Sequence, residues 1–218
     1  MLIIGIPKKG DDESFNAMID SLLKSTNAYD EIVVATPEDV TDLLLNNNAR
    51  VIHLIKKDFK SPLEAYNALF EYAKEKKADL LITQTDVIFP TKYKADWLTE
   101  MMTLAKNPIC GAVTCLGGYK YSGPDYVDGF PWLGGWCTYF PYRTIKQVGA
   151  YDESFPNGYG VDIDHSYAIH KAGLKVFLTD YWVHHHMQNE RLHDNDPNTE
   201  QMKKESAEYF RKKWKLQS

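Results

Sequence analysis

Short apolar runs alternate with amphipathic helical patterns through the first ninety residues, and this alternation restricts the possible folds more than any other feature of the sequence. Four runs have the length and flanking residues of buried strands, at 2–6, 31–35, 51–55 and 80–83. Helical spacing or start signals mark the segments between them, at 15–23, 37–45 and 62–73. Such alternation predicts an α/β fold with a mostly parallel sheet and helices on both faces.

The rest of the chain is less regular. Helices are expected at 97–104, 166–172 and 200–215, and strands at 111–114, 138–140, 174–178 and 182–186. Residues 116–136 are dense in glycine and aromatic residues, whereas 187–199 are polar and patternless, which is typical of a mobile loop. Because no internal repeat and no linker interrupts the chain, the sequence predicts one domain over residues 1–218.

Charge and cysteine content argue against several classes of protein. With 25 Lys and Arg against 30 Asp and Glu, the net charge of −5 argues against nucleic-acid binding through a general positive field. Cys110, Cys115 and Cys137 have no CxxC spacing, so neither a disulfide framework nor a thiolate zinc site is expected. No signal peptide and no apolar run of ~18 residues is found, so we expect a cytoplasmic protein.

Asp86 lies just beyond the fourth expected strand, after Gln84 and Thr85. Parallel sheets of this kind bind ligands beyond the carboxyl ends of their strands. A carboxylate there can hold a hard cation such as Mg²⁺. The alternative is an aspartate that opens the next turn, a position where this residue is common.

Asp162 and Asp164 lie two residues apart, between a Gly/Pro-rich stretch and an expected helix. In an extended segment the two carboxylates share a face, and at a helix start one of them would be the N-cap. We expect one of the pair to be a cap or structural acceptor. The other is then a candidate general base.

The histidine triplet 184–186 lies on the strand expected at 182–186, so His184 and His186 share a face. Two imidazoles on one face are good ligands for Zn²⁺ or Mn²⁺. The alternative is a polar strand end whose histidines are hydrogen-bonded within the protein.

Flat aromatic side chains are crowded into eighteen residues and suit stacking on sugar rings: Tyr119, Tyr121, Tyr126, Phe130, Trp132 and Trp136. Core packing is the alternative, chiefly for Phe130 and Trp136. Asn67 lies on the apolar stripe of its helix, where a buried amide needs hydrogen-bond partners. A structural bond to a neighbouring loop is its favoured role.

Taken in order, these segments resemble an inverting glycosyltransferase of family 2, which has the GT-A fold. The most specific stretches are VGAYDESF at 148–155, GVDID at 160–164 and AGLKV at 172–176. Weaker matches are QTDV at 84–87, AYN at 65–67 and FRKKW at 210–214. The resemblance implies a Rossmann-like sheet with a small mixed subregion on the acceptor side. Residues 1–90 would hold the donor, 91–186 the acceptor and catalytic groups, and 187–218 a loop and the last helix.

The resemblance also implies roles for individual residues on the donor side. Asp86 would bind the Mn²⁺ or Mg²⁺ that bridges the donor's diphosphate, with His184 or His186 as a further ligand. Asp162 matches the general base. Other donor contacts would come from Pro7, Asp39, Asn67 and Thr85.

On the acceptor side, Tyr126, Trp132 and Asp164 would contact a glycan or a lipid-linked sugar. The donor would be a nucleoside-diphosphate sugar, with UDP favoured, and no nucleic acid is involved. Six Lys and Arg residues against two Glu at 203–215 would suit a solvated helix face. A weak peripheral contact with an anionic membrane is the alternative.

Two departures from the family pattern leave other functions open. Gln84 replaces the first acid of the Asp-x-Asp element, which removes a negative charge near the metal, and Val161 replaces the glutamate before the base. One alternative is therefore a weak or inactive nucleotide- or sugar-binding module. Another is a nucleotidyltransferase. Such an enzyme needs a glycine-rich basic loop after the first strand, and Pro7–Gly10 matches that loop only weakly.

Overall fold

The computed structural model describes residues 1–38, 40, 52–89, 96–117, 133–185 and 198–216. These residues contain one sheet with the strand order β3-β2-β1-β4-β7-β6-β8-β5. The strands are β1 (Leu2–Pro7), β2 (Glu31–Thr36), β3 (Ile52–Lys56), β4 (Asp79–Thr83), β5 (Val87–Ile88), β6 (Cys110–Gly117), β7 (Cys137–Phe140) and β8 (Lys175–His185). The helices are α1 (Asp12–Ser25), α3 (Pro62–Lys76), α4 (Trp97–Ala105), α5 (Tyr142–Val148), α6 (Val161–Lys171) and α8 (Thr199–Trp214), with a 3₁₀ turn, η1 (Pro156–Gly158).

The sheet is mostly parallel, which confirms the predicted fold class. Strand β1 pairs in parallel with β2 and with β4, and Ile4 lies opposite both Ile32 and Leu81. Strand β7 is antiparallel to its two neighbours, β4 and β6, and β5 is antiparallel to β8. The antiparallel pairs therefore all involve strands of the less regular second part.

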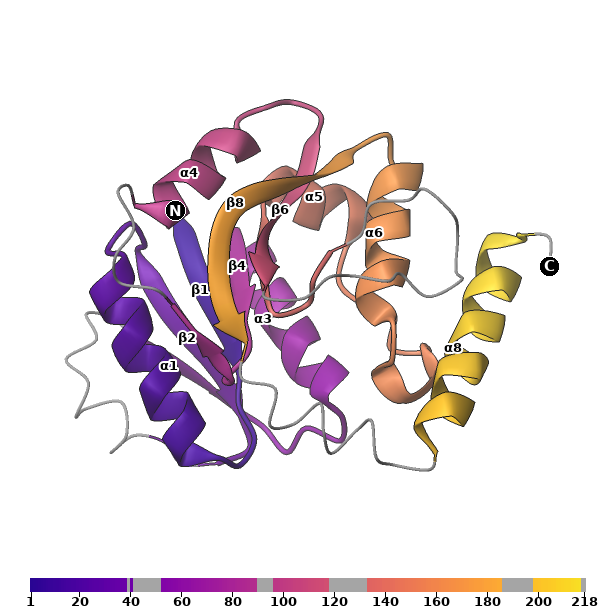
Figure 1. Cartoon of the computed structure of the whole chain (residues 1–218), viewed down its shortest axis with the longest axis horizontal. Helices are drawn as coiled ribbons and strands as arrows, with labels where there is room; N and C mark the ends of the chain where they lie inside the picture. The colour runs from indigo at the N-terminus through magenta and orange to yellow at the C-terminus, as the bar shows by residue number, and fades with distance from the viewer. Residues whose placement is uncertain (39, 41–51, 90–95, 118–132, 186–197, 217–218) are drawn as a thin grey trace.

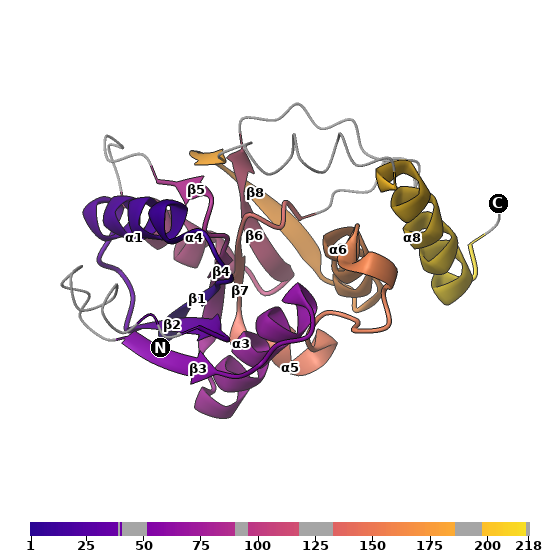
Figure 2. The ribbon, with the colours of Figure 1, turned by 90° about the horizontal axis from the view of Figure 1, so that it is seen from below.

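Helices cover both faces of the sheet, because strand side chains point alternately to one face and the other. Ile4 packs in a buried cluster with residues of α1 and α4, whereas its neighbour Ile3 packs in a second cluster with residues of α3, α5 and α6. Helix α8 lies apart from both faces, beside α6 and η1 (Figures 1 and 2). It belongs to a third, smaller cluster with Phe155 and Ile163.

Local signals in the sequence explain where α3 begins. The Ser61 hydroxyl accepts a hydrogen bond from the Glu64 amide at 3.3 Å, and Pro62 occupies the first turn. The Glu64 carboxylate reaches one residue further back than a capping box requires and accepts from the Lys60 amide at 3.0 Å. Both bonds satisfy amides that the helix itself cannot pair.

Two sequence predictions differ from the structure, and two short elements have no predicted counterpart. The expected strands 174–178 and 182–186 form one strand, β8, because the polar residues between them make a bulge where Cys115 pairs with Thr179 and Leu116 with Trp182. The helix expected at 166–172 begins at Val161. Strand β5 and helix α5 were missed, since both are too short to show a clear period. Most of 37–45 and 187–199 lies outside the described residues.

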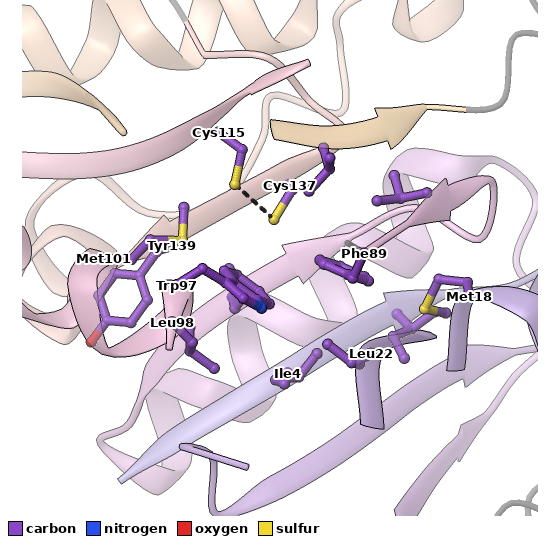
Figure 3. Close-up of a cluster of buried hydrophobic side chains, with 14 of the residues drawn as sticks. Ile4, Met18, Leu22, Phe89, Trp97, Leu98, Met101, Cys115, Cys137 and Tyr139 are labelled. Atoms are coloured by element: carbon purple, nitrogen blue, oxygen red, sulfur yellow. Dashed lines mark hydrogen bonds between the residues drawn. The ribbon is translucent and has the colours of Figure 1, made fainter. Parts of the chain in front are cut away.

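Aromatic stacking and buried thiols fill the core between the sheet and α4 (Figure 3). The Trp97 ring lies between Phe89 and Tyr181, stacked on each at a centroid distance of 5.0 Å. All three cysteines are buried free thiols, and the Sγ atoms of Cys115 and Cys137 are 3.5 Å apart across β6 and β7. Among the helices that the structure describes, none is both long enough and apolar enough to cross a bilayer.

Candidate active site

The candidate site begins where the carboxyl end of β4 leads into Gln84, Thr85 and Asp86, all partly exposed. Strand β5 follows at once, and its Val87 pairs with His185 at the end of β8. The backbone register therefore brings the end of β8, with His184 and His185, to the residue that follows Asp86. Two segments far apart in the sequence thus meet at one edge of the sheet.

Gln84 and Tyr66 form a neutral hydrogen-bonding pair at this edge. The Gln84 amide nitrogen donates to the Tyr66 hydroxyl at 3.2 Å, and the Gln84 backbone N–H donates to the Trp136 carbonyl at 3.1 Å. Burial raises the pKa of Tyr66 to about 12, and the charges of Asp86 and Asp162 contribute to the rise. The phenol therefore stays protonated at neutral pH and keeps its own hydrogen for a second partner.

Asp162 lies in the first turn of α6 and approaches Gln84 across a glycine. A Cβ built on Gly135 would lie 3.6 Å from Asp162 Oδ2 and 3.8 Å from Gln84 Nε2. Burial raises the pKa of Asp162 to about 6, although the Ile163 and Gly135 amides hydrogen-bond its carboxylate and lower that pKa. A carboxylate with a pKa near 6 can accept a proton at neutral pH and release it again.

Ser166 ties the backbone of Asp162 to the segment that carries Gly135. Its buried hydroxyl donates to the Asp162 carbonyl at 2.6 Å and accepts from the Leu133 amide at 2.7 Å. Tyr66, Gly135 and Ser166 were not singled out as site residues from the sequence. The AYN match at 65–67 pointed to the Tyr66 region, but no sequence pattern pointed to Ser166.

A buried lysine, Lys8, lies directly after β1, at the same edge of the sheet. The Lys8 ammonium lies 2.6 Å from Glu38 Oε2 and 2.7 Å from Asp12 Oδ1, and it donates to the Gly10 carbonyl at 3.1 Å. Burial lowers the pKa of Lys8, but the bonds to Asp12 and Glu38 outweigh it and hold that pKa above its usual value. With three acceptors for three hydrogens, this cation is committed within the protein.

Several solved structures that resemble this chain are glycosyltransferases. No known family profile and no curated protein matches the sequence. The mannosyltransferase PcManGT from Pyrobaculum calidifontis, solved with GDP-Man and Mn²⁺, has a TM-score of 0.68 and 16% identity over 88% of this chain. This chain spans 59% of the length of that protein. The chain has the GT-A fold.

Two further glycosyltransferases share the GT-A fold with this chain. Glucosyl-3-phosphoglycerate synthase from Mycobacterium tuberculosis, solved with phosphoglyceric acid, has a TM-score of 0.64 and 13% identity over 100% of this chain and 81% of its own. TarS from S. aureus, solved with UDP, has a TM-score of 0.61 and 10% identity over 98% of this chain and 72% of its own. At these identities the likeness establishes the fold.

A nucleotidyltransferase also resembles the chain. CMP:2-keto-3-deoxy-manno-octonic acid synthetase, solved with CTP, has a TM-score of 0.53 and 13% identity over 84% of this chain and 90% of its own. The GT-A arrangement by itself therefore does not choose between the transfer of a sugar and the transfer of a nucleotide.

Within the GT-A frame, two sequence-predicted residues have partners elsewhere. The Asn67 amide nitrogen donates to the Tyr151 carbonyl at 2.9 Å and to Glu153 Oε1 at 3.0 Å, and its oxygen accepts from the Tyr151 amide at 2.9 Å. This is the structural bond to a neighbouring loop that we favoured, and it leaves the amide no hydrogen for a donor. Asp164 faces α8, where Lys213 and Trp214 bind both of its oxygens.

The other predicted residues divide into those near the edge and those outside the description. Pro7 ends β1 opposite Ala35, at the same sheet edge as Thr85 and Asp86. Asp39, Tyr126, Trp132 and His186 lie outside the described residues, and His184 is described only by its backbone pairing with Ile88. The described residues contain no group of three His, Cys, Asp or Glu side chains that could hold a metal ion.

The oxygen donors at the edge nevertheless fit a hard divalent cation. Asp86 supplies a carboxylate, and Gln84 uses its amide nitrogen for Tyr66, which leaves the amide oxygen as an acceptor. Mg²⁺ and Mn²⁺ are commonly bound by one or two protein oxygens together with the phosphates of a substrate. The chemistry of these donors therefore suits a cation that arrives with a diphosphate.

Proposed function

We propose that this chain is an inverting glycosyltransferase, which moves a sugar from a nucleoside-diphosphate sugar, foremost a UDP-sugar, to a hydroxyl of a glycan or lipid-linked acceptor. One observation carries the proposal: Asp162, whose pKa is raised to about 6, lies across Gly135 from Gln84 at the carboxyl end of β4. The glycosyltransferase neighbours solved with GDP-Man or UDP support a nucleotide-sugar donor.

The proposed transfer is one displacement. The acceptor oxygen forms a bond to the anomeric carbon while the bond from that carbon to the diphosphate oxygen breaks on the opposite face. The Asp162 carboxylate takes the proton of the acceptor hydroxyl, and the nucleoside diphosphate leaves with the bonding electrons. A single attack from the opposite face inverts the configuration of the sugar. General-base assistance of this kind contributes about 10²–10⁴ in rate.

On the donor side, the chain's residues bind and orient the nucleotide sugar. The O–H of Tyr66 donates to an oxygen of the nucleotide sugar. Asp86 and the Gln84 oxygen would hold Mn²⁺ or Mg²⁺, and the bound cation would neutralise the charge that develops on the leaving diphosphate. Asp86 immediately precedes β5, which pairs with the end of β8, so the histidine triplet is a proposed further source of ligands.

The remaining parts of the chain take proposed roles around this site. Residues 1–90 hold the donor, 91–186 carry the acceptor and catalytic groups, and 187–218 add the last helix to the same domain. Two cations of the basic helix have acidic partners within the protein, since Lys213 pairs with Asp164 and Lys203 with Glu200. These pairs reduce the charge available to an anionic membrane, so a peripheral contact would be weak.

A binding module without turnover is the second candidate, and Gln84 is the observation that favours it. An amide that donates to Tyr66 stands where a second carboxylate would strengthen metal binding. A nucleotidyltransferase is less well supported, because Lys8 in the loop after β1 is held by Glu38 and Asp12.

Thermal stabilisation by UDP, GDP and dTDP, each with and without Mn²⁺, tests donor binding first. A nucleotide at 100 times its Kd adds about 2.7 kcal/mol to the free energy of unfolding. We expect UDP to stabilise the protein only with Mn²⁺, and Asp86→Ala to abolish that effect. The control is Asp20→Ala, which removes an exposed carboxylate on α1. If the nucleotide stabilises the protein equally without Mn²⁺ and in Asp86→Ala, the proposed donor site is contradicted.

Hydrolysis of the donor sugar then separates the enzyme from the binding module. A nucleotide identified by stabilisation is supplied as a series of nucleotide sugars, and release of free nucleoside diphosphate is measured. Slow metal-dependent release by wild type, lost in Asp162→Asn, supports the transferase. Tight binding of the same donors without any release favours the binding module.

A further inference from the structure

The last helix of the described chain, α8, is attached to the segment that carries Asp162. Tyr209 packs edge-on against Phe155 with ring centroids 5.2 Å apart, and Tyr167 of α6 contacts Phe210 at 5.3 Å and Trp214 at 4.9 Å. The Ser206 hydroxyl donates to the Pro156 carbonyl at 3.2 Å. These contacts converge on residues 155–167, away from the two large clusters that flank the sheet.

A partly buried charge cluster reinforces this attachment. The Lys213 ammonium lies 2.6 Å from Asp164 Oδ2 and 2.8 Å from Asp152 Oδ2. Trp214 donates to the other Asp164 oxygen at 2.8 Å, and the Tyr209 hydroxyl donates to Asp152 at 3.0 Å. Asp164 is 3% exposed, so water cannot solvate its carboxylate. The hydrogen bonds and ion pair with these partners take the place of water.

Asp152 and Asp164 bracket the segment that Lys213 joins. Between them lie η1 and two glycines in the left-handed region, Gly158 (φ 68°) and Gly160 (φ 75°). Gly160 is the N-cap of α6 and supplies no side-chain hydrogen bond to its first turn. The first turn of α6 therefore has no cap from its N-cap residue and follows two glycines, which restrict the backbone less than other residues do, so we expect other contacts to hold its orientation.

Helix geometry links this cluster to Asp162. Residues two apart on a helix point to nearly opposite sides, so the side that turns Asp164 towards α8 turns Asp162 away from α8. The observed contacts agree with this geometry, because Asp162 lies beside Gly135 while Asp164 binds Lys213. Holding Asp164 thus fixes the rotation of the turn and, with it, the direction of the Asp162 carboxylate.

We propose that Lys213 is a positioning residue, which bridges Asp152 and Asp164 so that the first turn of α6 presents the Asp162 carboxylate to the acceptor hydroxyl. The catalytic consequence rests on the proposed transferase function, whereas the geometric role does not. Lys213 does not touch the reacting atoms. Lys213 acts through Asp164, and the packing of α8 places Lys213 beside that carboxylate.

Lys213→Met tests the proposal, with Lys212→Met as the matched control on the same helix and Lys213→Arg as the conservative rescue. Lys212 is exposed and adjacent, so its substitution removes the same charge without breaking the bridge. We expect Lys213→Met to lower kcat by about 10- to 100-fold, the cost of a misplaced catalytic group, with the KM for the donor unchanged. Lys212→Met should match wild type, and Lys213→Arg should recover most of the activity.

Measurements without turnover keep the two proposals separate. In Lys213→Met, hydrogen exchange of amides 160–166 should accelerate, and the titration of Asp162 followed by ¹³C NMR should shift; neither should change in Lys212→Met. Wild type that releases no product from any donor defeats the proposed function, while these two readouts still decide the role of Lys213. Unchanged exchange and an unchanged Asp162 titration in Lys213→Met overturn it.

A neutral double variant covers the case in which Lys213→Met fails to fold. Lys213→Met with Asp164→Asn leaves no unpaired buried charge, and Trp214 can still donate to the amide oxygen. We expect this variant to fold, to bind the donor as wild type does and to keep the low kcat, because the bridge to Asp152 is lost. Wild-type kcat in the folded double variant overturns the proposal.

Discussion

Two regions supply the candidate site: the half of the protein around β1, β2 and β4, and the region around α6 and α8. Different interactions stabilise each of them. Around β1 the strands are buried on both faces and pack between α1 and α3 through aliphatic side chains. Around α6, the first turn is positioned by polar contacts with distant segments: Ser166 of α6 joins it to Leu133, and Lys213 and Trp214 of α8 bind Asp164.

In the proposed transferase, this difference separates donor binding from catalysis. Apolar packing does not depend strongly on direction, so it suffices to bring Gln84 and Asp86 to the sheet edge where we propose that the donor binds. A proton acceptor must be aimed, and hydrogen bonds and ion pairs are the directional interactions that can aim it. The region that carries Asp162 therefore depends on pairs that single substitutions can remove.

Asp162→Asn is the largest test of this comparison. We expect transfer to fall by about 10²–10⁴ while metal-dependent stabilisation by the nucleotide is retained, since the donor side belongs to the other region. In wild type the rate should rise with pH through about 6, as Asp162 loses its proton. Initial rates across pH 5–8 check this, and full activity in Asp162→Asn would remove Asp162 from the role of base.

The same variant has an opposite effect on stability. Burial holds the proton on Asp162 up to about pH 6, whereas an unfolded aspartate releases it near pH 4. Stability that is present below pH 4 is therefore lost as the pH rises through 6, and asparagine avoids that loss. At pH 7 the Tm of Asp162→Asn should exceed that of wild type.

Two glycines compare the packing of the two regions directly. A Cβ on Gly111, in β6, would lie 2.4 Å from Ile169 Cγ2 and 2.9 Å from Leu174 Cβ, whereas a Cβ on Gly5, in β1, would meet only leucine methyl groups at 3.0–3.3 Å. Gly111→Ala should cost about 1–3 kcal/mol of unfolding free energy, because α6 must move. Gly5→Ala should stay within about 1 kcal/mol of wild type, since methyl groups can shift. Urea titration measures both, and equal losses would contradict the contrast.

A buried histidine gives the smallest expected effect. His165, on α6, lies among the rings of Phe70, Phe140 and Tyr151, and neither ring nitrogen has a hydrogen-bond partner among the residues that the structure describes. Burial lowers the pKa of His165 to about 3. Below pH 6.5 this side chain therefore binds a proton in the unfolded chain but stays neutral in the folded chain. Stability is therefore lost as the pH falls from 6.5 towards 3.

Between pH 7 and pH 5.5 this proton costs about 1.2 kcal/mol. Chemical denaturation of wild type and His165→Phe at both pH values should show that extra loss in wild type alone. His165→Leu serves as a second variant if the larger ring disturbs the packing. The same pH dependence in wild type and variant would mean that His165 is charged in the folded protein.

Most of the sheet could be predicted from the sequence because its information is local. The runs at 2–6, 31–35 and 80–83 become β1, β2 and β4 within one residue at each end, and Ser61 and Pro62 mark the start of α3. Strand β8 was divided in two because a bulge and a strand end look alike in one sequence, and only pairing with β6 distinguishes them. The one-turn helix η1 and the short α5 carry too few residues to show a period.

Less of the site could be predicted, because its contacts join distant residues. The strand end at Asp86 and the two aspartates at 162 and 164 were visible as residue types in the right place. Asp164 binds Lys213, which is 49 residues away in the sequence, and the bond between Gln84 and Tyr66 depends on how α3 packs beside β4. Pairings of this kind leave no periodic trace in a sequence.

The attachment of α8 also sets an order of assembly. A chain made from its N-terminus forms β1, β2 and β4 with their covering helices well before residue 213 leaves the ribosome. Until then Asp164 lacks the ammonium group of Lys213, and the turn that carries Asp162 follows two glycines without that ion pair to hold it. In the proposed transferase, the donor side would thus form before the turn that carries Asp162 is held in place, so a nascent chain without residue 213 would bind a sugar nucleotide without consuming it.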